Sequence, residues 1–157
     1  MKRNLNVRIL ALAMTLLMGT LPVVAEERPF ALTGNGVSTF ITDAAGNIIG
    51  ANVTGSGTAT HLGLWTVVGT VHFTPDPNNP GRLLSSATTT FTAANGDKLQ
   101  VSLTGSLDPA AGADMGTIHF VGGTGRFAAA SGAGEFVVEL NPATGGFKVT
   151  MVGNIDY

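Results

Sequence analysis

Apolar and polar residues alternate repeatedly along this chain, and the alternation limits its fold more than any other feature. In the run DKLQVSLTGSL, residues 97–107, leucine and valine alternate with lysine, glutamine, serine and threonine. A period of two gives a β-strand one apolar and one polar face, whereas an amphipathic helix needs a period of about 3.6 residues. Comparable runs predict eight strands, at about 30–42, 50–60, 64–74, 83–93, 97–107, 115–122, 132–140 and 146–157.

Short segments rich in Gly, Asn, Asp and Pro separate these runs and predict tight turns. Asn95-Gly96 is the clearest, and we expect a two-residue type I′ turn there, with positive φ at both residues. Eight strands with short connections predict an all-β fold, an eight-stranded antiparallel up-and-down β-barrel of the calycin-like kind, because a closed sheet has no exposed edge. The chain has no cysteine, so this sheet must be stable without disulfides.

The N-terminal residues have the pattern of a secretory signal peptide. Lys2, Arg3 and Arg8 precede an apolar run, and small residues precede a cleavage site after Ala25. The apolar run, residues 9–21, is too short to cross a bilayer comfortably as a helix. We therefore expect residues 1–25 to be removed, residues 26–157 to form a single β-barrel domain, and the protein to be secreted or periplasmic, from a bacterium.

The charge of the remaining chain argues against a nucleic-acid partner, and its aromatic content argues against insertion in a membrane. Five basic and ten acidic residues remain, a formal charge of −5, which disfavours nucleic acid. The last run ends on Tyr157, as strands of outer-membrane barrels often do, so a small outer-membrane barrel is an alternative. Because one Trp and one Tyr cannot form the aromatic girdles of such a barrel, we expect no membrane insertion.

The glycine-rich stretch VGGTGRFAAASGAGEF, residues 121–136, has the spacing Gly123-x-Gly125-x-x-Ala128 of a dinucleotide-binding loop. Such a loop needs a helix whose N-terminal amides face the phosphates, and only about one helical turn fits before the next glycines. We therefore expect no nucleotide. The stretch instead predicts a short helical turn at about 124–130, between two strands, with Phe127 tucked under the barrel.

The same stretch resembles the allene oxide cyclase-like and dirigent-like barrels, in which a GGTGxF-x-x-A-x-G sequence links two late strands. The matching residues are Gly122, Gly123, Thr124, Gly125, Phe127, Ala130 and Gly132. The segments GTATHLG, residues 57–63, and FTAANGDKL, residues 91–99, resemble a group of exported bacterial proteins with that barrel. The resemblance implies a barrel fold and chemistry on hydrophobic small molecules inside it, but it assigns no catalytic residue to this chain.

The titratable residues give little sign of catalysis. His72 and His119 share faces with threonines and should point outward, so with His61 they should not form a metal site. His61 should lie at a tight turn near a barrel mouth, either as a functional group or satisfying backbone groups. Asp108 and Asp114 flank one loop, without the apolar surroundings that raise the pKa of a carboxyl group.

These observations favour a soluble, non-catalytic binding or structural module for a small hydrophobic molecule. A cyclase or isomerase acting on a hydrophobic substrate inside the barrel, and a surface or matrix scaffold, are the alternatives. We expect no metal and no cofactor, and the oligomeric state stays open. Arg126 could receive an anionic group or brace its turn through an ion pair. The predicted ligand-binding residues are Trp65, Phe73, Leu103, His61 and Arg126.

Overall fold

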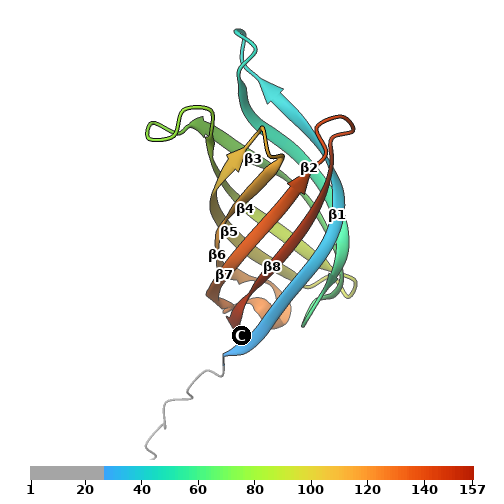
Figure 1. Cartoon of the computed structure of the whole chain (residues 1–157). Helices are drawn as coiled ribbons and strands as arrows, with labels where there is room; N and C mark the ends of the chain where they lie inside the picture. Colours follow the sequence, from blue (N-terminus) through green and yellow to red (C-terminus); the bar gives the residue numbers. More distant parts are fainter. Residues whose placement is uncertain (1–26) are drawn as a thin grey trace, which may run out of the picture.

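The computed structural model describes residues 27–157, which form one closed antiparallel barrel (Figure 1). Each strand pairs with the next one in sequence, and the last pairs with the first, so the predicted eight-stranded up-and-down barrel is confirmed. The predicted signal peptide at residues 1–25 lies outside the described residues. The strands are β1 (Arg28–Thr42), β2 (Ile48–Ala59), β3 (Gly63–Pro75), β4 (Leu83–Ala93), β5 (Lys98–Asp108), β6 (Ala113–Gly123), β7 (Ser131–Leu140) and β8 (Gly146–Asp156).

The alternation seen in the sequence becomes an inner and an outer face of the sheet. Along β5, Leu99, Val101, Leu103 and Leu107 are buried, and the residues between them are exposed or half-buried. Every predicted strand is present, with ends within two residues of those expected. Within residues 27–157, no helix is long and apolar enough to cross a membrane.

One end of the barrel is closed by the segment between β6 and β7 (Figure 1). A short 3-10 helix, η1 (Gly125–Phe127), confirms the predicted helical turn in a shorter form. The Phe127 ring is completely buried, and its centroid lies 5.0 Å from that of Tyr157 at the C-terminus. Phe127 therefore plugs the closed end, as the sequence predicted.

The loops β1–β2, β3–β4, β5–β6 and β7–β8 all lie at the opposite end, which we term the open end (Figure 1). The buried residues Ala51, Phe73 and Leu107 form a separate apolar cluster near it. Phe40 and Leu140 are partly buried against this cluster. Both ends of the barrel are thus occupied by apolar side chains.

The turn at Asn95-Gly96 differs from the predicted type I′ turn. Gly96 has a φ of 90°, but the only described non-glycine residue with positive φ is His61, so Asn95 does not adopt the type I′ conformation. The Gly96 N–H donates to the Ala93 carbonyl at 2.9 Å, which is a type I turn followed by a left-handed glycine. The Asn95 side chain holds this three-residue loop by accepting a 3.1 Å hydrogen bond from the Asp97 N–H.

Candidate functional site

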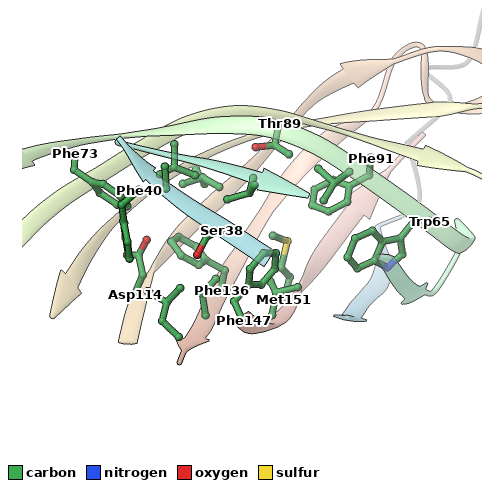
Figure 2. A pocket seen from close by; sticks show the side chains of 18 residues that line it. Ser38, Phe40, Trp65, Phe73, Thr89, Phe91, Asp114, Phe136, Phe147 and Met151 are labelled. Carbon is green, nitrogen blue, oxygen red and sulfur yellow. The ribbon is translucent and has the colours of Figure 1, made fainter. Parts of the chain in front are cut away.

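The barrel contains an apolar cavity of about 90 Å³ (Figure 2). Its lining comes from every strand and includes Val67, Phe91, Leu103, Phe136 and Met151. In Figure 2 the Trp65 indole lies at one end of this space, and Phe40, Phe73 and Asp114 lie at the other. The cavity therefore runs along the barrel, from the Trp65 floor towards the open end.

Glycines on the inner face make room for the aromatic rings that shape this cavity. A Cβ atom at Gly105 would lie 2.7 Å from the Phe136 ring, and one at Gly57 would lie 2.8 Å from the Trp65 ring. Real Cβ atoms do not approach other atoms this closely, so each ring occupies the space that a side chain would have filled. The Met115 carbonyl oxygen is as close at Gly105, and the Thr33 carbonyl oxygen is closer at Gly57, so these glycines allow close strand approach as well as ring packing.

One carboxyl group lies inside this apolar space. Asp114 on β6 is only 6% exposed, and its Oδ1 accepts a 2.8 Å hydrogen bond from the Ser85 hydroxyl on β4. Burial raises the pKa of Asp114 above its ordinary value, because a charge is poorly solvated there, and the Ser85 hydrogen bond partly opposes that rise. The pair can therefore accept a hydrogen bond or, when Asp114 is protonated, donate one.

The expectation that Asp114 lies without apolar surroundings was wrong. The strand β6 begins at Ala113, before the predicted start at residue 115, and so Asp114 belongs to the strand. On β6 it shares the inner face with Ile118 and Phe120, which are both buried. The signal was present in the sequence, because Asp114, Ile118 and Phe120 have the same parity.

Other polar groups border the cavity. The hydroxyl of Ser38, a lining residue, donates a 2.9 Å hydrogen bond to the Gly145 carbonyl and so fixes the β7–β8 loop at the open end. Thr89 lines the wall on β4. The Trp65 Nε1 atom is buried and has no hydrogen-bond partner among the described residues. The interior is thus mainly apolar, with its hydrogen-bonding groups at a few positions.

Three of the five predicted ligand-binding residues lie at this cavity and two do not. Trp65, Phe73 and Leu103 line it. His61 lies at the β2–β3 turn at the closed end, where its Nε2 is 3.0 Å from the Pro29 carbonyl oxygen. Arg126 forms an ion pair with Asp97, with 3.3 Å between Nε and Oδ2. Both therefore contact the closed end of the barrel and are absent from the cavity lining.

The remaining titratable candidates face away from the interior. His72 and His119 are exposed on β3 and β6, as the alternation predicted. Among residues 27–157, no three His, Asp or Glu side chains gather as metal ligands would.

Comparison with known proteins identifies solved structures with a similar fold. No protein-family model matches the chain, and no curated protein matches it. The structure of the pterocarpan synthase dirigent protein GePTS1 aligns with a TM-score of 0.58 at 14% identity, covering 91% of this chain and 98% of that one. The pterocarpan synthase dirigent protein PsPTS1 aligns with a TM-score of 0.55 at 14% identity, covering 84% and 97%. At this identity the similarity shows the fold alone, and this chain therefore forms a dirigent-like barrel.

Proposed function

We propose that the barrel is a non-catalytic binding module for a small, mainly apolar molecule that carries one hydrogen-bonding group. The observation that supports this is the apolar cavity with a single buried carboxyl group, Asp114, paired with Ser85. Ligand sites of this kind combine an apolar lining with a few placed polar groups. A scaffold without a ligand would need no such cavity, so its presence favours binding over the scaffold alternative.

The volume of the cavity limits the size of the ligand. Apolar cavities of about 150 Å³ in other proteins bind benzene or xenon. The cavity here measures about 90 Å³, which is smaller, so a ligand of one ring would also occupy space towards the open end. The apolar part would lie against Phe91, Leu103 and Met151, and the polar group would meet Asp114.

Two molecules of nearly the same shape test the polar contact. In 4-fluorophenol a hydroxyl replaces the methyl group of 4-fluorotoluene, and fluorine NMR reports the binding of each. We expect both to bind, with 4-fluorophenol about 2- to 12-fold tighter, because a net hydrogen bond contributes about 0.5–1.5 kcal/mol.

Two substitutions at Asp114 are the controls. Asp114→Leu should bind both compounds without preference, and Asp114→Asn should keep part of the preference because an amide still forms hydrogen bonds. If neither compound binds the natural protein, the proposed function is wrong. An unchanged preference in Asp114→Leu would show that the polar group does not meet this carboxyl.

A second candidate is a cyclase or isomerase, and the raised pKa of Asp114 favours it. A buried carboxyl group that keeps its proton more readily can act as a general acid in an apolar cavity. The dirigent proteins GePTS1 and PsPTS1 are named as pterocarpan synthases, which supports the same candidate. Mass spectrometry of a co-purified molecule, before and after incubation with fresh protein, tests it: a changed mass or isomer that Asp114→Asn fails to produce would favour the enzyme.

We also propose that the protein acts after export. The support is the basic start, the apolar run and the small residues before Ala25. Amino-terminal sequencing of protein recovered from the periplasm or medium should begin at Glu26. Recovery of the protein in the cytosol with an intact N-terminus would contradict export.

A further inference from the structure

The seam between β3 and β4 is interrupted in the middle of the barrel wall. Trp65–Val67 pair with Phe91–Ala93, and His72–Pro75 pair with Leu83–Ser86. Residues 68–71 and 87–90 lie between these paired runs and make no ladder pairs with each other. The register is the same on both sides, so no residue is inserted. Among the ladders of the described strands, this is the only four-residue interruption without a change of register.

The side chains at this interruption are small and uncharged. The sequence is Val-Gly-Thr-Val on β3 and Ala-Thr-Thr-Thr on β4. The inward-facing positions are Gly69, Val71, Ala87 and Thr89, and two of these, Val71 and Thr89, line the cavity. The interruption therefore lies directly beside the cavity and holds no bulky group that blocks it.

Gly69 has no local structural reason to be glycine. Its φ lies outside the left-handed region, and a Cβ atom there would meet only the Thr89 side chain, at 3.9 Å. Every other described glycine either has positive φ or would bring a Cβ atom within 3.4 Å of another atom. What distinguishes Gly69 is therefore the free space on the inner face of the sheet beside Thr89, in the middle of the interruption.

The outer side of the interruption is apolar. Val68 is 78% exposed, the highest value among the exposed large hydrophobic residues of the described chain. Its neighbours across the seam are threonines, and no charged residue occurs in either four-residue segment. An apolar molecule approaching this surface would meet no charge that it must desolvate.

We propose that residues 68–71 and 87–90 form a lateral portal, through which a small apolar molecule passes between solvent and the cavity. This proposal rests on the proposed binding function. Separating the strands here breaks no ladder pair, whereas elsewhere it would break several hydrogen bonds, each contributing about 1 kcal/mol net. Phe127 closes one end of the barrel axis, whereas Phe40 and Phe73 line the cavity at the open end, so we propose the portal as the faster of two routes.

A removable crosslink tests the portal. The chain has no cysteine, so Thr70→Cys with Thr88→Cys can form only one disulfide, across the interruption on its outer face. Thr66→Cys with Thr92→Cys is the matched control, because that pair lies in the same ladder and on the same face where the strands are paired. Mass spectrometry establishes that each disulfide has formed.

Fluorine NMR of 4-fluorophenol then measures both its affinity and its exchange rate. In the oxidised Thr70/Thr88 variant, we expect association and dissociation to slow by about tenfold or more with little change in affinity. Dithiothreitol should restore both rates, and the control crosslink should leave them unchanged. Equal slowing by both crosslinks would contradict the portal, because it would reflect general stiffening of the barrel.

Gly69→Val adds a side chain on the inner side of the interruption without oxidation, and it provides the test of the portal if the disulfide does not form. The added side chain should slow exchange while the protein stays folded, since valine suits a strand better than glycine. Unchanged exchange in Gly69→Val, or weaker affinity with an unchanged association rate, would overturn the portal. If 4-fluorophenol fails to bind even the natural protein, the proposed function fails and the portal with it; binding without any effect at the seam overturns the portal alone.

Discussion

The Ser85 hydroxyl reaches across β5 to donate a 2.8 Å hydrogen bond to Asp114. Gly105 lies between them, paired with Ser85 on one side and with Gly116 on the other. A Cβ atom at Gly105 would lie 2.9 Å from the Ser85 Oγ and 2.7 Å from the Phe136 ring. The one hydrogen-bonded carboxyl group in the cavity therefore depends on a glycine in the intervening strand.

Gly105→Ala should consequently destabilise the barrel by about 1–3 kcal/mol, as is typical of overpacking. Gly69→Ala is the matched control, because the same methyl group enters open space and removes glycine's entropic cost, which is about 0.5–1 kcal/mol. Urea unfolding of both variants measures the difference. Equal effects at the two positions would contradict the packing described here.

The pH dependence of stability should identify Asp114. Burial raises the pKa of this carboxyl above its ordinary value of 3.8 in the folded state. At pH values between 3.8 and the raised pKa, Asp114 keeps its proton in the folded protein but has lost it in the unfolded chain. The contribution of Asp114 to stability therefore falls as the pH rises through this range.

Asp114→Asn lacks that proton and should be more stable than the natural protein at neutral pH, with an advantage that shrinks on acidification. Hydrogen bonds from Asn47 lower the pKa of Asp43, which gives the opposite trend, but this affects both proteins equally and cancels in the comparison. Urea unfolding across the acidic range provides the test. A stability difference that is independent of pH would show that the Asp114 pKa is not raised.

The left-handed glycine of the β4–β5 hairpin should resist substitution. Gly96 has a φ of 90°, which a β-branched residue adopts only at a cost, so Gly96→Val should destabilise by about 1–3 kcal/mol. Ala94→Val in the same exposed loop, where φ is not positive, is the control and should change stability far less. Thermal unfolding of the two variants side by side distinguishes conformational strain from a general effect on the loop.

Trp65 should report the state of the interior. It is the only tryptophan, is 2% exposed, and lies on the cavity lining. Its emission should therefore be at short wavelength and resist quenching by iodide or acrylamide. Emission like that of free tryptophan would mean that β3 does not present this face inward.

Much of this fold could be predicted because its information is local. A period of two identifies a strand and its inner face from a few residues, so the strand positions and the inward direction of Trp65, Phe73 and Leu103 follow from the sequence. The Phe127 plug also follows, because the surrounding glycines leave room for only one helical turn.

The errors arose where a side chain or a distant strand decides the outcome. The Asn95 side chain accepts a hydrogen bond from the loop backbone, which favours a type I turn with one left-handed glycine over the expected type I′ turn. Asp114 was missed because a strand boundary placed two residues late moved it into a loop. The interruption between β3 and β4 depends on pairing between strands, and no pattern within either strand reveals it.

The most direct test of the account is whether filling the cavity prevents binding. Leu103 lines the cavity, and Leu103→Trp adds volume there at a cost of about 1–3 kcal/mol in stability. A fluorine NMR titration should show saturable binding of 4-fluorophenol to the natural protein and none to folded Leu103→Trp. Equal binding to both proteins would place the ligand outside the cavity, and that result would contradict the central claim that the barrel interior is the binding site.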